Sequence, residues 1–114
     1  MTPEPATWQQ DPALTLPDYG GGSLVNLMSS IATALGGSSP YPPLRLLPPD
    51  ALAGARHVVL LVVDGLGLET LSGRDGALRR HLHGQLSSVF PSTTASAIPT
   101  FLTGLAPQQH GLTG

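Results

Sequence analysis

Two positions in the sequence combine reactive side chains with a setting that favours chemistry. Asp64 directly follows the apolar run 58–63, and the pair Thr93 and Thr94 follows a second apolar run, 86–90. In open α/β sheets, ligands bind at the carboxyl ends of the strands, where loops and helix N-termini meet. A carboxylate beside a hydroxyl at a helix start, whose free N–H groups attract an anion, suits metal-assisted chemistry on a phosphate.

The same residues also have ordinary structural explanations. An Asp-Gly pair after a strand is often only a turn, which would account for Asp64 and Gly65. A hydroxyl before a helix is usually a cap, and Ser92 or Thr93 would serve in that role. Pattern alone therefore favours a turn and a helix cap at these two positions.

The histidines and cysteines give no metal-binding pattern. His81 and His83 stand two residues apart in an expected helix, so they cannot share a face, and His57 precedes an expected strand. The sequence contains no cysteine, which removes thiolate metal sites and disulfides. We therefore assign no metal ligand to either residue type.

The apolar pattern predicts elements that would bring Asp64 and Thr94 together. The continuous apolar run 58–63 is typical of a strand buried on both faces of a parallel sheet. Strands alternating with helices indicate an α/β fold with a right-handed crossover. The expected strands, 58–63 and 86–90, would be parallel neighbours, with Asp64 and Thr94 at one edge of the sheet. The expected helices are 24–35, capped by Ser23 and ended by Gly36 and Gly37; short pieces within 66–73 and 75–84, the second capped by Asp75; and 92–103, ended by Gly104.

Composition limits the class of protein. The chain has 114 residues, a net charge of −2 and 40% hydrophobic residues, which fits one globular unit. It has no lysine and its five arginines are scattered, so no basic stripe exists to bind nucleic acid. The N-terminus lacks the basic and apolar regions of a secretory signal, so the cytoplasm is the expected location. The run 58–63 is far shorter than the roughly 20 residues of a membrane-spanning helix, and no membrane partner is expected.

Proline and glycine divide the chain into an arm and a body. Residues 1–22 contain four prolines and close with Gly20 to Gly22, which favours a flexible N-terminal arm. Residues 23–114 are expected to form the ordered domain. Within it, residues 38–49 contain five prolines and are expected to run extended over its surface.

Two longer motifs resemble a known family. The stretches "VVLLVVDGLG" and "SSVFPSTTASAIPTFLTGLAPQQHGLTG" are similar to the N-terminal part of the alkaline phosphatase superfamily, and most similar to its type I phosphodiesterase and nucleotide pyrophosphatase branch. The resemblance extends from Tyr19 onward. It implies the start of a three-layer αβα fold with a mostly parallel sheet, incomplete in this chain.

The resemblance also implies roles for individual residues. Asp64 corresponds to a carboxylate that binds one of two catalytic metal ions. Thr94 corresponds to the nucleophile, which also binds that ion, and Thr93 is its nearest rival in "FPSTT". The tail 103–111 corresponds to a chiefly structural part of the family, so we do not carry His110 over as a ligand.

The function implied by the resemblance is that of a metal-dependent phosphoesterase. It would use two divalent ions, zinc or alternatively manganese, and a phospho-threonine intermediate to hydrolyse a small-molecule phosphate ester or a nucleotide. The family's remaining Asp and His ligands lie far downstream of the "HG" motif, so we expect this chain to be an N-terminal fragment that is inactive alone.

Two alternatives come from other functional classes. The first is a non-catalytic fragment that binds or complements a C-terminal half. The second is a nucleotide-binding module built on "DGLGLET". That motif lacks the third glycine of the dinucleotide fingerprint and the Gly-Lys-Ser/Thr of a P-loop, so it is the weakest of the three hypotheses.

Overall fold

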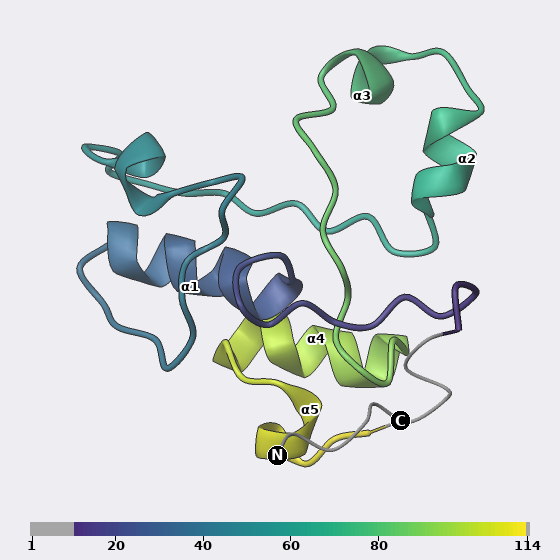
Figure 1. Ribbon diagram of the computed structural model, residues 1–114. Helices are drawn as coiled ribbons and strands as arrows, with labels where there is room; N and C mark the ends of the chain where they lie inside the picture. Colours follow the sequence, from purple (N-terminus) through teal and green to yellow (C-terminus); the bar gives the residue numbers. More distant parts are fainter. Residues whose placement is uncertain (1–10, 114) are drawn as a thin grey trace, which may run out of the picture.

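The computed structural model describes residues 11–113 of the chain. This part consists of short helices joined by long irregular segments (Figure 1). Among the described residues, no helix has the length and apolar character needed to cross a membrane. In chain order the elements are α1 (Leu24–Ala34), the 3₁₀ helix η2 (Pro49–Leu52), α2 (Leu68–Ser72), α3 (Ala77–Arg80), α4 (Thr94–Thr103) and α5 (Pro107–His110).

The first long helix, α1, begins and ends at the signals that the sequence predicts. Ser23 is the N-cap in extended conformation (φ −128°, ψ 179°), and its backbone N–H donates to Asn26 Oδ1 at 2.9 Å. This bond is one half of a capping box. Beyond the last turn, Gly36 has a φ of 88° and the N–H of Gly37 donates to the Ala32 carbonyl oxygen at 2.7 Å. The predicted helix is therefore confirmed.

The buried side of α1 is not the side that its apolar spacing predicts. Leucine and methionine recur at helical spacing around Leu27 and Met28, and both side chains are only half-buried. Leu35, at the end of this stripe, is 54% exposed. The fully buried residues of α1 are instead Val25, Asn26, Ser29 and Ser30.

The polar side of α1 is buried because it supplies hydrogen bonds to the proline-rich segment 38–48. Ser29 Oγ donates to the carbonyl oxygen of Tyr41 at 2.6 Å, and Ser30 Oγ accepts from the N–H of Leu44 at 2.8 Å. The segment has no helix or strand of its own, so its covered backbone groups need other partners. It crosses the surface of α1 as a connector, as predicted.

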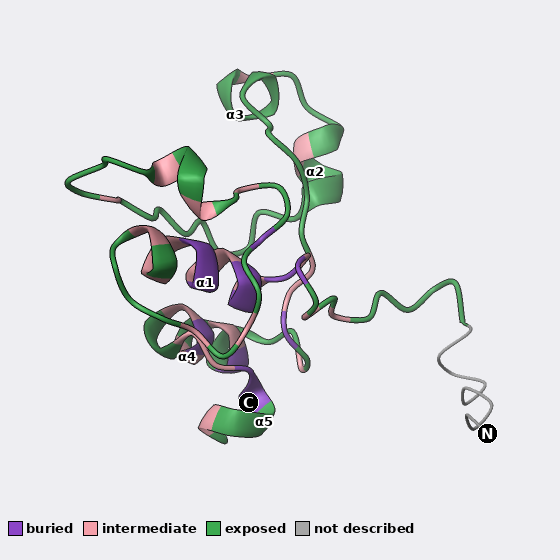
Figure 2. Ribbon diagram, turned by 60° about the vertical axis from the view of Figure 1, so that its left-hand side comes forward, coloured by how far each residue is buried: buried purple, intermediate pink, exposed green. Residues whose placement is uncertain are grey.

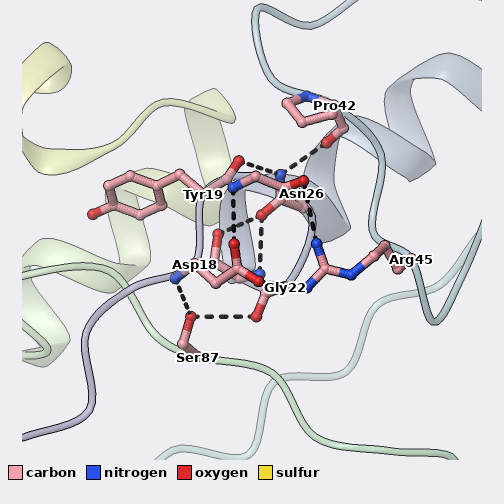
Figure 3. A network of polar contacts seen from close by, with 9 residues as sticks. Asp18, Tyr19, Gly22, Asn26, Pro42, Arg45 and Ser87 are labelled. Carbon is pink, nitrogen blue, oxygen red and sulfur yellow. Dashed lines mark hydrogen bonds and ion pairs between the residues drawn. The ribbon is translucent and has the colours of Figure 1, made fainter.

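Asn26 joins three parts of the chain through one buried side chain (Figure 3). Its Oδ1 accepts from the backbone N–H and the hydroxyl of Ser23, at 2.9 and 2.7 Å. Its Nδ2 donates to the carbonyl oxygens of Tyr19, at 2.7 Å, and Pro42, at 2.9 Å. The arm before α1, the start of α1 and the connector after it are thus tied to one residue.

The predicted α/β fold, with three αβα layers and a mostly parallel sheet, is wrong for the residues that the structure describes, which contain no sheet. Their one β-type pairing is an isolated parallel bridge between Ser23 and Ser87, held by two backbone hydrogen bonds. The expected strand 86–90 therefore pairs at a single point with the start of α1, and does not pair with 58–63.

Residues 58–63 are neither helix nor strand, and they cross from η2 to α2 as an open trace (Figure 1). Within the described residues, none of their backbone groups forms a backbone hydrogen bond. Val59 is 90% exposed and Leu61 is 80% exposed. A strand needs a neighbouring strand to receive its hydrogen bonds, and an apolar run gives no information about where that neighbour lies. The prediction failed for this reason.

The two helical pieces expected between the apolar runs are confirmed as α2 and α3, but neither buries a residue (Figure 2). The prediction that Asp75 caps α3 is wrong, because Gly76 is the N-cap of that helix. The Oδ1 atom of Asp75 accepts from the adjacent N–H of Gly76 at 2.9 Å, so it does not bond to the later amides that a cap side chain reaches.

The core lies where α1, α4 and α5 meet the segment around residue 89 (Figure 2). Val25, Val89 and Ala106 are its buried apolar residues. Tyr19 and Tyr41 pack against this cluster and meet edge to face, with ring centroids 6.0 Å apart. α1 packs against α4, and α4 packs against α5. This core holds α4, which starts at Thr94.

Of the predicted arm 1–22, residues 1–10 lie outside the described part of the chain, and its boundary at residue 22 remains a prediction. The described end of the arm contacts the body. The N–H of Asp18 donates to Ser87 Oγ at 2.9 Å, and its carboxylate pairs with Arg45. Gly21 has a φ of 142°, and a Cβ there would lie 2.7 Å from Arg45 Nη1. Glycine is therefore needed at position 21 because of this positive φ, whereas the Arg45 side chain could move aside.

We predict that Asn26→Ala lowers the free energy of unfolding by about 3 kcal/mol, because it leaves the buried N–H of Ser23 without an acceptor and two partly buried carbonyl oxygens without donors. Denaturant unfolding followed by circular dichroism measures this change. Thr33→Ala is the matched control, since Thr33 is exposed on the same helix and its loss should cost less than about 0.5 kcal/mol. Equal effects of the two substitutions would contradict the role given to Asn26.

We also predict a pH dependence that involves Asp18. The hydrogen bond from Arg45 holds the pKa of Asp18 below its ordinary value of 3.8. A lowered carboxyl pKa stabilises the fold above the unfolded-state pKa, and the contribution is lost as the pH falls through the folded-state pKa. Between pH 5 and strongly acidic pH, Asp18→Asn should therefore lose less stability than the unsubstituted protein. Parallel acid-unfolding curves for both proteins would argue against this contribution.

Candidate active site

α4 begins at the hydroxyl pair that the sequence singles out. Thr93 is the N-cap (φ −80°, ψ 157°), and its Oγ1 accepts from the N–H of Ser96 at 3.3 Å. At the other end, Gly104 adopts the left-handed conformation (φ 70°), and its N–H donates to the Thr100 carbonyl oxygen at 2.8 Å. The predicted helix and its glycine stop are confirmed. Thr93 caps the helix, so the hydroxyl of Thr94 is not needed as a cap and can contact another residue.

The structure brings Asp64 and Thr94 into direct contact. Thr94 Oγ1 donates to Asp64 Oδ2 at 2.9 Å, across 30 residues of sequence. The other carboxylate oxygen of Asp64 accepts from the N–H of Gly65 at 2.8 Å, and Gly65 turns the chain with a φ of 75°. Both side chains of the pair are exposed. The predicted proximity is therefore present, although a turn and a helix start produce it in place of a sheet edge.

The helix start beside this pair suits an anionic ligand. The first two amide groups of α4, those of Thr94 and Ala95, donate no hydrogen bond within residues 11–113. Free N–H groups and the helix dipole together attract negative charge at such a position. A phosphate oxygen near Thr94 would thus meet hydrogen-bond donors in addition to the hydroxyl.

The opposite side of α4 anchors the helix. Ser96 and Thr100 are fully buried there. His110 Nε2 lies 3.1 Å from the Ser96 carbonyl oxygen and 3.3 Å from Thr100 Oγ1. Thr100 Oγ1 also donates to the Leu105 carbonyl oxygen at 2.7 Å. His110 thus makes structural contacts that fasten α5 to α4, a role that its sequence spacing alone does not reveal.

The metal ions implied by the family resemblance can be tested against the donors present. Asp64 and Thr94 offer a carboxylate and a hydroxyl, and oxygen donors of this kind suit zinc and manganese. Within residues 11–113, no three His, Cys, Asp or Glu side chains gather closely enough to hold a metal ion. Zinc normally takes about four ligands. The pair therefore fits part of the coordination of one ion, and not that of two.

An apolar groove of about 880 Å³ lies beside the segment that leads into α4. Leu14 and Leu16 line it from the arm, and Phe90 and Pro91 line it from the segment before α4. Gln108 of α5 also lines the groove. The sequence does not predict this groove, because Leu14 and Leu16 are isolated apolar residues in a proline-rich arm.

The match to a family model agrees with this arrangement. The model of the type I phosphodiesterase / nucleotide pyrophosphatase family matches residues 58–114, a span that contains both Asp64 and Thr94. The chain belongs to this family, as the resemblance of its motifs implies. No curated protein and no solved structure matches the chain.

We predict that Thr93 and Thr94 differ in their effect on stability. Thr93→Ala should lower the free energy of unfolding by about 1 kcal/mol, because it removes the side-chain cap of α4. Thr94→Ala should change it by less than about 0.5 kcal/mol, because the residue is exposed and its partner is exposed too. Thermal and denaturant unfolding of the two variants measures the difference. A larger loss for Thr94→Ala would give that residue a structural role.

Proposed function

We propose that this chain supplies the nucleophile and the first metal ligand of a metal-dependent phosphoesterase. The observation that carries the proposal is the hydrogen bond from Thr94 Oγ1 to Asp64 Oδ2. It joins the two positions at which the type I phosphodiesterase resemblance implies chemistry, and both lie within the span matched by the family model. The substrate would be a small-molecule phosphate ester or a nucleotide.

The proposed chemical step uses the chain's own hydroxyl. Thr94 Oγ1 gives up its proton to solvent and attacks phosphorus, the bond to the leaving oxygen breaks, that oxygen takes a proton from water, and a phospho-threonine forms. Water then attacks the same phosphorus, which releases phosphate or a phosphate monoester and restores the hydroxyl. A divalent cation bound by Asp64 and Thr94 would supply the positive charge that makes this hydroxyl a stronger acid.

Neighbouring groups support attack by Thr94. Asp64 Oδ2 accepts a hydrogen bond from Thr94 Oγ1, 2.9 Å away, and so orients the lone pairs of that hydroxyl. The free N–H groups of Thr94 and Ala95 lie at the helix start, where a phosphoryl oxygen of the substrate would accept their hydrogen bonds. The apolar groove beside Phe90 and Pro91 would accept the organic part of the ester.

The other ligands of a complete site would come from residues outside those described. A carboxylate and a hydroxyl leave about half of a zinc coordination shell open. We therefore propose that turnover requires a further chain segment that carries Asp and His ligands. The alternative function is a non-catalytic chain that binds such a segment. The exposure of the apolar run 58–63 favours its association with another segment or another chain under either hypothesis.

We predict that the 114-residue chain shows no hydrolysis of bis(p-nitrophenyl) phosphate with added zinc or manganese. Joined to the ligand-bearing downstream part of a family member, it should show turnover that Thr94→Ala abolishes. Thr93→Ala should retain much of this turnover and serves as the neighbouring-hydroxyl control. Loss of activity in Thr93→Ala alone would move the nucleophile by one residue. Absence of turnover in every joined protein would favour the non-catalytic alternative.

A further inference from the structure

Residues 56–64 form an exposed segment whose sequence is nearly symmetric about Leu60. Valines at 58 and 62 lie two residues to either side of it, and Arg56 and Asp64 lie four residues to either side. The backbone groups between these ends form no backbone hydrogen bond within the described residues. Arg56 forms no ion pair there either. The segment thus presents unpaired backbone groups, an apolar centre and opposite charges at its ends.

This symmetry has a geometric consequence for two copies of the chain. In an antiparallel pair, residues directly opposite each other point to the same face of the ribbon. A twofold axis at Leu60 therefore places Leu60 opposite its own copy and Val58 opposite Val62. It also places Arg56 opposite Asp64. All of these side chains lie on one face, since alternate residues of a strand share a face.

Other registers are less complementary. Moving the axis by one residue, to Leu61, places Asp64 opposite Val58 and leaves Arg56 without an acidic partner. Opposite charges directly across a ribbon stabilise a pairing, and like charges destabilise it. The charges at the two ends therefore select the register centred on Leu60.

We propose that residues 56–64 are a self-association site, through which two copies of this chain pair antiparallel with Leu60 on the twofold axis. An isologous contact of this kind closes on itself and gives a dimer. Apolar contacts and the shared backbone hydrogen bonds provide the affinity, while the two pairs of Arg56 and Asp64 set the register. The proposal concerns association between copies, and it does not rest on the proposed function.

The first test measures the oligomeric state of the 114-residue chain by sedimentation velocity over a range of concentrations. We expect a dimer, and Leu60→Lys should raise its dissociation constant by at least about tenfold because two ammonium groups would meet at the axis. Leu102→Lys is the control, since Leu102 is 81% exposed and Leu60 is 40% exposed. A monomer at all concentrations, or an equal effect of the control, would overturn the proposal.

A second test examines the charged pairs. Arg56→Glu and Asp64→Arg should each weaken the dimer, because each places like charges opposite one another. The double variant, Arg56→Glu with Asp64→Arg, restores opposite charges across the ribbon and should recover most of the lost affinity. A double variant no tighter than either single variant would rule out this register.

A third test fixes the register covalently. The chain contains no cysteine, so one introduced thiol reports on one contact. Leu60→Cys should form an interchain disulfide rapidly on mild oxidation, because the two Cβ atoms would lie about 5 Å apart. Leu61→Cys should form it slowly, because its nearest copy lies diagonally, about 7 Å away or more. The reverse order, or equal rates, would contradict an axis at Leu60.

Discussion

The hydrogen bonds of the buried Asn26 side chain are the interactions on which the rest of the fold depends. It occupies the point where the arm, the cap of α1 and the proline-rich connector meet, and it satisfies backbone groups from all three. A chain without a sheet has many backbone groups that no regular element pairs, and burying them unpaired is costly. Together with Ser29 and Ser30, Asn26 allows irregular segments to cover α1.

The position of Thr94 depends on α1, because α1 and α4 share the buried core. Val25 of α1 and Val89 form one buried cluster, and Ala97 of α4 packs against it. The first turn of α4 therefore depends on a helix that lies before the span matched by the family model, which starts at residue 58. The family motif contributes Thr94, and the preceding segment contributes the packing that orients its helix.

Local signals were predictable from the sequence, and non-local pairing was not. The ends of α1 and α4 follow from Ser23, Thr93 and Gly104, because a cap involves only residues within one turn. The prediction of strands at 58–63 and 86–90 was wrong, because the sequence of a strand does not indicate which segment it pairs with. The buried polar side of α1 was also missed, since apolar spacing cannot show which backbone groups elsewhere need hydrogen bonds.

The contact between Asp64 and Thr94 was predicted correctly, but from a fold that is wrong. Both residues were expected at one edge of a sheet, and that sheet is absent from the described residues. Their contact depends instead on the turn at Gly65 and the start of α4. Membership of the type I phosphodiesterase family was accessible from the motifs, because a motif preserves the order of reactive residues without specifying their surroundings.

The exposed stretch 64–86 also determines how firmly Asp64 and Thr94 are held together. Its far end is fixed by the bridge between Ser23 and Ser87, and closing a flexible stretch of this length costs on the order of 3 kcal/mol in chain entropy. One hydrogen bond between two exposed side chains returns only about 0.5 kcal/mol, and α2 and α3 bury nothing that would add to it. The pair is therefore in an opening and closing equilibrium. A ligand that bridges the oxygens of Asp64 and Thr94 must first offset this entropy cost, and its binding would order the exposed stretch 64–86.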